Sequence, residues 1–300
     1  MRPMIDRDTQ FCMSIAARPG HFGTRFHNFL YRELGLNFLY KAFAVQDPVG
    51  AIMGIRALNI RGCAVSMPFK EVVIGLVDEV MPSAAAIRSS NTVVNDGGVL
   101  RAYNTDYVAV EALLRLRGVT AAWPFALAGS GGMARAVAGA LRTAGFDDGL
   151  IVARNADAGS ALSAACGYRW APAIGDDRPA LLINCTPVGM AEGPAPGESP
   201  FPAGAVATAL TVFDVIARPP ETPLISMAQS FGRPVITGAD VIVLQAVEQF
   251  ELYTGLRPDE DLIRRAAAFA LSERPELTNP AWPVGAPTGT ASRRTMKPDN

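Results

Sequence analysis

The chain has 300 residues, of which 49% are hydrophobic and 18% are charged, and its formal net charge is -1. This length is sufficient for two domains with a well-buried core, and the composition is typical of a soluble globular enzyme. Because the charges nearly cancel, nothing favours nucleic acid or an anionic membrane as a partner. No uninterrupted apolar run is long enough to cross a membrane.

Cysteine and histidine usage argues against disulfides and metals. Four cysteines lie far apart, without disulfide or metal spacing: Cys12, Cys63, Cys166 and Cys185. With no signal peptide either, we expect a cytoplasmic protein with reduced thiols. Only two histidines are present, His21 and His27, so a His-rich metal site is excluded and we expect no bound metal. The sequence does not distinguish a monomer from a homodimer.

Strand and helix signals alternate through the first hundred residues. Strands are predicted over residues 11–17, 38–45 and 62–67, and helices over residues 25–34, 49–58 and 71–80. Two further strands, at 91–95 and 99–103, flank Asp96-Gly97-Gly98, a glycine-containing hairpin signal. Asp106 then opens a helix to about residue 116, where an acid can cap the free N–H groups.

The second half of the chain alternates in the same way. Strands are predicted over residues 125–128, 150–153, 181–184, 211–214 and 234–236, and later helices over residues 222–231, 241–253 and 259–271. This alternation favours an open parallel sheet covered by helices on both faces. Over residues 273–300 the composition changes to Pro, Gly, Thr and Ser, which predicts a disordered tail.

Residues 125–143 read as strand, glycine turn and helix, with a G-x-G-x-x-A spacing from Gly129 to Ala134. The first glycine permits a sharp turn, the second lets the backbone approach a pyrophosphate, and the third small residue lets the helix pack on its strand. Free N–H groups and the helix dipole then hold the phosphates. The stretch predicts a dinucleotide site; the alternative is a tight helix–strand crossing without a ligand.

Three short stretches carry candidate chemistry. Lys70 follows Ser66-Met67-Pro68-Phe69 at the end of a predicted strand, where a lysine is either catalytic or a solvated charge. Asn91-Thr92 opens the hairpin, and Tyr103-Asn104-Thr105-Asp106 closes it. Asn104 and Asp106 could equally serve as turn and cap residues.

Together with two later motifs, these stretches resemble the shikimate dehydrogenase family, in particular its shikimate dehydrogenase-like branch, over about residues 10–272. The motifs are Val65 to Glu71, Ser90-Asn91-Thr92, Asn104-Thr105-Asp106, Gly129-Ser130-Gly131-Gly132, Asn184 to Met190 and Val243-Leu244-Gln245-Ala246. The resemblance implies an α/β enzyme that interconverts 3-dehydroshikimate and shikimate with a nicotinamide cofactor.

The same likeness implies a domain plan. Residues 1–105 would form an N-terminal α/β substrate domain, and residues 106–238 a C-terminal Rossmann domain that binds NAD(P). Helices in 239–272 would return to the substrate domain, and the active site would occupy the cleft between the domains. The small-molecule substrate would bind in that cleft.

Residue roles follow from the matched motifs. Lys70 and Asp106 would be the catalytic pair, and the substrate would be held by Ser66, Asn91 and Gln245. The cofactor would be held by Gly129, Ser130, Gly131, Gly132, Met133, Ala134, Arg154 and Gly238. Amides such as Asn91 and Gln245 suit a polyhydroxylated ring because each offers a donor and an acceptor. On the helix after residue 241, Gln249 lies one turn beyond Gln245 and could also face the cleft, whereas His27 fits a buried or capping role.

The substrate side departs from the family pattern. The two serines that usually bind the substrate carboxylate fall on His21 and Gly23, so both hydroxyls are absent. Other anion ligands could be Arg18, His21, Thr24 or Ser14.

Two further positions differ near the reacting groups. Ala217 takes the place of a tyrosine in the substrate site, and Val241 that of a methionine near the nicotinamide. We therefore expect slow oxidation of shikimate, or a related carboxylated cyclic alcohol as the substrate. The alternative is a non-catalytic sensor of a dinucleotide and a ring acid, although proton-transfer groups have no clear purpose in a binder.

Cofactor preference is partly encoded after the second strand of the nucleotide unit. Arg154 stands where NAD-binding proteins place an acid, and it could stack on adenine and meet a 2′-phosphate, which favours NADP. Asp157 could oppose a phosphate, so NAD stays the alternative.

Overall fold

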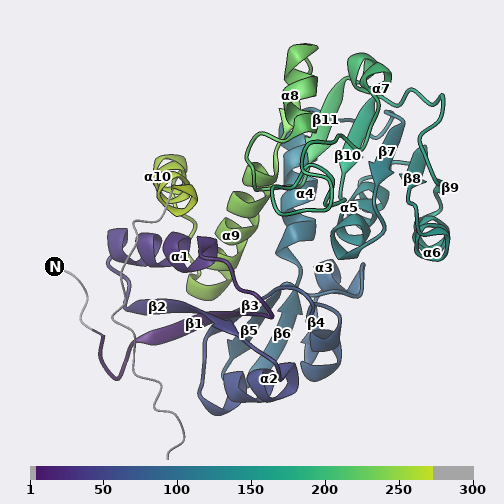
Figure 1. The fold of residues 1–300 in the computed structure, drawn as a ribbon. Helices are drawn as coiled ribbons and strands as arrows, with labels where there is room; N and C mark the ends of the chain where they lie inside the picture. Colours follow the sequence, from purple (N-terminus) through teal and green to yellow (C-terminus); the bar gives the residue numbers. More distant parts are fainter. Residues whose placement is uncertain (1–4, 273–300) are drawn as a thin grey trace, which may run out of the picture.

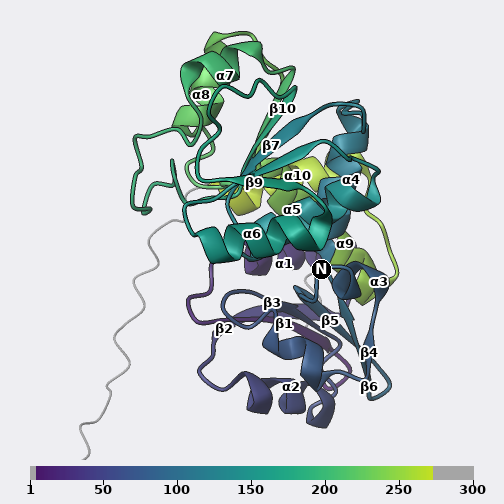
Figure 2. The ribbon, with the colours of Figure 1, turned by 90° about the vertical axis from the view of Figure 1, so that its right-hand side faces the viewer.

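Two six-stranded sheets organise residues 5–272, the part of the chain that the computed structural model describes (Figure 1). The predicted tail, residues 273–300, lies outside the described residues. Figure 2 shows the two sheets one above the other, each with its own helices. Between residues 5 and 272, no helix is both long and apolar enough to cross a membrane.

The first sheet has the strand order β2-β1-β3-β5-β6-β4. β1 pairs in parallel with β2 and β3, whereas β5 runs antiparallel to β3 and β6. The first sheet is therefore mixed, because the predicted hairpin at Gly97-Gly98 reverses the chain. The elements are β1 (Gln10–Ala16), α1 (Phe22–Glu33), β2 (Phe38–Ala44), α2 (Pro48–Ala57), β3 (Gly62–Val65), the 3-10 helix η1 (Val72–Leu76), β4 (Glu79–Val80), α3 (Pro82–Ala85), β5 (Thr92–Asp96) and β6 (Val99–Tyr103).

The helix predicted over residues 71–80 is wrong. That segment forms the short 3-10 helix η1 and then the edge strand β4, which pairs in parallel with β6. Glu79 lies opposite Arg101, and the Arg101 guanidinium donates to its carboxylate at 2.7 Å. The strand conformation of residues 79–80 thus depends on Arg101, a partner 22 residues away, and the local sequence pattern could not show this.

The second sheet, with the order β12-β11-β10-β7-β8-β9, is parallel throughout, as predicted. All four residues of β7, β10 and β11 are buried, as expected for strands covered on both faces. The elements are α4 (Thr105–Leu116), β7 (Phe125–Ala128), α5 (Gly132–Thr143), β8 (Gly149–Val152), α6 (Ala156–Cys166), β9 (Arg169–Ala171), β10 (Leu181–Asn184), α7 (Ala203–Thr208), β11 (Thr211–Asp214), α8 (Pro223–Ser230) and β12 (Val235–Ile236).

The chain crosses between the two sheets twice. α4 leads from the first sheet to the second, and α9 (Gly238–Thr254) leads back and packs against α4 (Figure 1). Phe250 and Tyr253 of α9, with α10 (Glu260–Leu271), share one core with Phe26 and Tyr40 of the first unit. The last two helices therefore pack on the first unit.

Candidate active site

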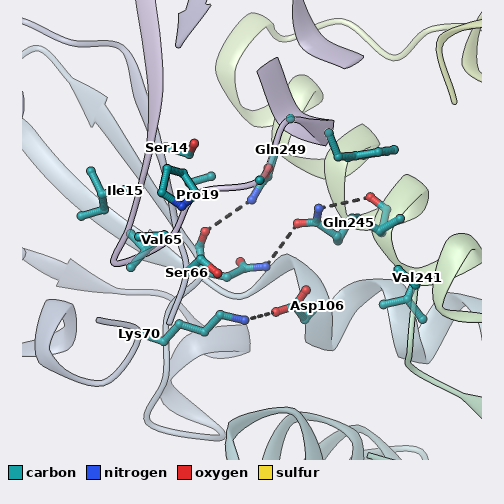
Figure 3. Close-up of a pocket in the computed structure, with 18 of the residues that line it drawn as sticks. Ser14, Ile15, Pro19, Val65, Ser66, Lys70, Asp106, Val241, Gln245 and Gln249 are labelled. Carbon is teal, nitrogen blue, oxygen red and sulfur yellow. Dashed lines mark hydrogen bonds and ion pairs between the residues drawn. The ribbon is translucent and has the colours of Figure 1, made fainter. Parts of the chain in front are cut away.

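A cavity of about 310 Å³ lies between the two units (Figure 3). One side is formed by β1, the loop after it, the loop after β3 and Asn91. The other side is formed by Asp106, Met133 at the start of α5, the loop after β11, and α9. The cavity therefore lies where the resemblance placed the active site.

Lys70 and Asp106 meet at one end of this cavity. The Lys70 Nζ lies 2.6 Å from the Asp106 Oδ2, and the two side chains are 24% and 10% exposed. The Ser90 N–H donates to the Lys70 carbonyl at 2.8 Å, which fixes the turn after β3. The two residues that the sequence singled out therefore form a close, largely buried ion pair.

The cap of α4 is Asn104, not Asp106. The Asn104 side chain accepts a hydrogen bond from the Tyr107 N–H at 2.9 Å, which satisfies one of the free donors of the first turn. The expected capping by Asp106 is wrong, because Asp106 is the second residue of the helix and its carboxylate faces Lys70. The cap thus leaves the carboxylate free for the cavity.

The predicted amides form a network rather than three separate ligands. The Asn91 Oδ1 accepts from the Thr105 N–H at 2.7 Å, and its Nδ2 lies 3.4 Å from the Gln245 Oε1. Gln249 donates to the Thr92 hydroxyl at 3.0 Å. Asn91 is 3% exposed, and protein groups occupy most of the hydrogen-bonding capacity of its amide. Its main contribution is therefore to connect α4, β5 and α9.

Some of the other predicted substrate residues line the cavity and some do not. Ser66, Gln245 and Gln249 line the cavity, as do Ala217 and Val241. Ser14 and Arg18 also line it, whereas His21 and Thr24 are not among its lining residues. The structure therefore narrows the four candidate anion ligands to two.

His27 has a structural position. It is fully buried on α1 and its ring stacks on Tyr40 at a centroid distance of 4.5 Å. Burial lowers the pKa of its imidazole to about 3. A neutral, enclosed histidine agrees with the predicted buried role.

A second cavity, of about 1000 Å³, extends over the carboxyl ends of β7, β8 and β10. Its lining includes Gly129, Ser130, Gly131 and Arg154, four of the predicted cofactor residues. The open edge of a parallel sheet is the usual place for a dinucleotide in such folds.

The glycine turn at this cavity has the geometry that a pyrophosphate needs. Gly129 has a φ of 120°, which L side chains rarely adopt, and a Cβ there would lie 2.9 Å from the Cys185 carbonyl oxygen. Gly131 is the N-cap of α5 with no side-chain cap, so the first N–H groups of the helix keep no side-chain partner there. These residues fit a dinucleotide phosphate.

The remaining cofactor residues have different surroundings. Gly132 opens α5, Ala134 is buried in the core of the second unit, and Met133 lines the first cavity. Gly238, at the start of α9, also lines the first cavity, and a side chain there would collide with the Ile216 backbone. Arg154 is exposed at the rim of the second cavity. The first turn of α5 therefore separates the two cavities.

Tyr40 is the cavity residue that the sequence did not single out. It lies on β2, lines the cavity and is 2% exposed. Within residues 38–44 it is one aromatic residue of an apolar strand, so no local signal distinguished its hydroxyl. The register Cys12↔Tyr40, which follows from strand pairing, brings it beside β1.

Two family models match the chain. They are the shikimate dehydrogenase substrate binding domain, over residues 22–93, and the shikimate 5'-dehydrogenase C-terminal domain, over residues 238–268. Each match falls on a segment that contributes to the first cavity.

Individual relatives extend the similarity over both units. A shikimate dehydrogenase-like protein of Haemophilus influenzae is 52% identical over 267 residues, which cover 89% of this chain and 98% of the relative. The structure of a shikimate 5-dehydrogenase-like protein matches with a TM-score of 0.88 at 51% identity and covers 90% of this chain and 100% of that one. A Thermus thermophilus shikimate 5-dehydrogenase, solved with NADP(H) and shikimate, matches with a TM-score of 0.78 at 30% identity, over 87% and 99% of the chains. Because these similarities reach 52% identity and span both units and almost the whole length of each relative, the chain belongs to the shikimate dehydrogenase family.

Proposed function

We propose that this protein is an NADP-dependent oxidoreductase that interconverts 3-dehydroshikimate and shikimate, or a closely related carboxylated cyclic alcohol. The observation that carries the proposal is the Lys70–Asp106 ion pair, 2.6 Å apart, in a cavity that borders the first turn of α5. A proton-transfer pair is thereby adjacent to a turn that fits a dinucleotide.

The chain supplies the proton chemistry of such a reaction. Interconverting a secondary alcohol and a ketone moves the hydroxyl proton together with a hydride. A bound nicotinamide supplies the hydride carrier. The Lys70 ammonium has three N–H donors, so it can donate to a ketone oxygen while it also donates to Asp106. Asp106 orients the ammonium, and its second carboxylate oxygen can accept from a neighbouring hydroxyl.

The cofactor would be held by residues 129–134 along the turn and by Arg154 at the rim. The exposed Arg154 guanidinium can pair with a 2′-phosphate, and the similar Thermus thermophilus structure contains NADP(H), so we propose NADP over NAD. Ser66 and Gln245 would hold ring hydroxyls. The four cysteines are free within residues 5–272, and we propose a cytoplasmic enzyme with reduced thiols.

The test follows nicotinamide absorbance with purified protein, using shikimate or quinate with NADP or NAD. We expect turnover with shikimate, a preference for NADP, and a loss of about 10² to 10⁴-fold in kcat for Lys70→Ala. The matched control is Lys41→Ala, because Lys41 is exposed on β2, where its ammonium lies over the Phe43 ring and outside the cavity.

Two outcomes would contradict the proposal. Equal losses of kcat in Lys70→Ala and Lys41→Ala would show that Lys70 takes no part in the reaction. If the protein turns over no carboxylated cyclic alcohol in a panel while calorimetry still detects dinucleotide binding, it would be the non-catalytic sensor and not an enzyme.

A further inference from the structure

Two ion pairs between described residues join the first unit to the second, and both start from adjacent residues of the turn after β3. One is the pair of Lys70 with Asp106. In the other, the guanidinium of Arg135 on α5 donates to the Glu71 carboxylate at 2.6 Å. The proposed reaction uses the first pair and leaves the second without a role.

The Glu71 carboxylate is not used by its own helix. Glu71 is the N-cap residue of the 3-10 helix η1, but its side chain makes no capping hydrogen bond there. An acid at such a position commonly accepts from a free N–H group of the first turn. Here the carboxylate pairs with Arg135 of the other unit instead. It therefore links two units and does not stabilise the local helix.

Arg135 lies in the first turn of α5, directly beside the glycine turn. Its N–H donates to the Gly131 carbonyl at 3.0 Å, so its backbone is bonded to the turn that fits a pyrophosphate. One helical turn further along, a Cβ at Gly139 would lie 2.5 Å from the Cγ2 of Ile87, which follows α3. The face of α5 that includes Arg135 therefore packs against the first unit.

The turn after β3 has a further connection to the second unit through Ile87. The Ser90 N–H donates to the Lys70 carbonyl at 2.8 Å. Ile87, three residues before Ser90, is buried in the hydrophobic core of the second unit. The backbone of Lys70, its ammonium and the neighbouring Glu71 are therefore each connected to the second unit.

We propose that Arg135 is a positioning residue, which holds the Lys70 turn against the nucleotide-binding turn through its ion pair with Glu71. The inference rests on the proposed function, because it takes Lys70 as the proton donor and a dinucleotide as the hydride carrier. The dinucleotide would be held by the second unit, whereas Lys70 belongs to the first, so their alignment depends on contacts between the units. The Lys70–Asp106 pair fixes the ammonium, and the Glu71–Arg135 pair fixes the backbone next to it.

The exposure of the pair separates positioning from stability. The Arg135 and Glu71 side chains are 43% and 57% exposed. An ion pair with this exposure contributes little to the free energy of unfolding, because water and salt screen it. A small displacement of a reacting group, in contrast, lowers the rate strongly. Loss of the pair should therefore change kcat far more than the melting temperature.

A double-mutant cycle tests this role. Steady-state kinetics with NADP and shikimate, or with the carboxylated cyclic alcohol that the panel identifies, would compare the wild type with Arg135→Gln, Glu71→Gln and the double variant. We expect each single substitution to lower kcat about 10-fold. Both KM values should stay within about twofold of those of the wild type. Because the two side chains act through one contact, the double variant should have the kcat of the single variants.

The matched control is Arg142→Gln. Arg142 lies on the same helix, and its exposed ion pair with Asp147, at 2.5 Å, stays within the second unit. Its loss should leave kcat unchanged. Arg135→Lys is the conservative variant. It should retain most of the wild-type kcat, because the charge remains and the contact with Glu71 is one hydrogen bond.

Hydrogen exchange of the protein without substrate separates this inference from the proposed function. Amides of residues 69–74 should exchange faster in Arg135→Gln and Glu71→Gln than in the wild type and Arg142→Gln. That result supports the positioning of the Lys70 turn even if no alcohol is turned over. Unchanged exchange, or losses of kcat that multiply in the double variant, overturns the inference and leaves the reaction standing. A normal kcat with weaker NADP binding in Arg135→Gln alone also overturns it, because Arg135 would then be a phosphate ligand.

Discussion

Asp214 is a buried carboxyl that the proposed reaction does not use. It ends β11 with no exposed surface and accepts hydrogen bonds from Asn184 Nδ2 at 3.1 Å, the Ile216 N–H at 3.0 Å and the Thr222 hydroxyl at 2.7 Å. Burial raises the pKa of this carboxyl to about 6, although the three hydrogen bonds act in the opposite direction. These bonds connect β10 and β11 to the N-cap of α8, so the residue has a structural role.

The raised pKa predicts a pH-dependent stability term with a defined sign. In the unfolded chain this carboxyl ionises near 3.8, and in the folded protein near 6, so between these values the folded state binds more protons. Its contribution to the free energy of unfolding is therefore greatest below about pH 4, falls by up to about 3 kcal/mol as the pH rises to 6, and is constant above that. Asp214→Asn removes this term, and the Thr222 hydroxyl can rotate to accept from the new amide.

Urea unfolding of the wild type and of Asp214→Asn between pH 4 and 7 would measure this difference. Other carboxyls titrate in both proteins, so only the difference between the two curves reports on Asp214. We expect the stability of the variant relative to the wild type to increase as the pH rises from 4 to 6. Parallel curves over this range would show that Asp214 is ionised throughout.

The turn from β7 to α5 is the element that joins the fold to the proposed cofactor. Two of its positions are occupied by glycine for different physical reasons. Gly129 needs its positive φ and its close approach to Cys185, whereas Gly131 has an ordinary φ of -79° and open space where a Cβ would stand. The open space beside Gly131 belongs to the second cavity.

This difference predicts that two alanine substitutions separate stability from binding. Gly129→Ala should destabilise the protein by about 1–3 kcal/mol through backbone strain, in addition to the contact with Cys185. Gly131→Ala should leave the melting temperature unchanged and weaken NADP binding, because its methyl group enters the space for the pyrophosphate. Thermal scans and calorimetric titration with NADP would test both. A stable Gly129→Ala, or unchanged binding by Gly131→Ala, would contradict this account of the turn.

Elements with strong local signals were predictable from the sequence. The β7–turn–α5 unit, the hairpin at Gly97-Gly98 and the parallel sheet of the second unit all follow from periodicity and glycine placement. Lys70 and Asp106 came from motif likeness, and their contact at 2.6 Å agrees with a shared site. Their proposed catalytic role stays a prediction.

Elements that depend on distant partners were not predictable. Residues 79–80 form a strand because β6 is beside them, and the short helices α3 and α7 were missed for want of a repeating pattern. The position of Tyr40 at the cavity depends on contacts with Gly23, His27 and Asn28 of another element, and no property of β2 alone reveals it.

At the scale of the whole molecule, Arg61 connects the first unit to the far end of α9. Its guanidinium donates to the Tyr253 carbonyl at 2.9 Å and to the Leu252 carbonyl at 3.1 Å, residues that lie 192 and 191 positions away in the chain. The last carbonyls of a helix have no partner inside it, and a cation there also matches the helix dipole. Arg61 donates to the Asn95 carbonyl at 2.9 Å as well, so one side chain holds β5 and α9 together.

This connection predicts that Arg61→Ala weakens the docking of α9 on the first sheet. We expect a loss of about 1–3 kcal/mol, since buried carbonyls lose charged donors, and a melting temperature lowered by about 2–4 °C for each kcal/mol. The matched control is Arg257→Ala. Arg257 lies beyond the same end of α9, but its ion pairs are local, with the partly exposed Glu248 and Glu251, so less than about 1 kcal/mol should be lost. Hydrogen exchange should be faster at residues 250–254 in Arg61→Ala and unchanged in β7 and β10. Equal destabilisation by the two substitutions would mean that α9 is held by its apolar face alone, through Phe250 and Tyr253.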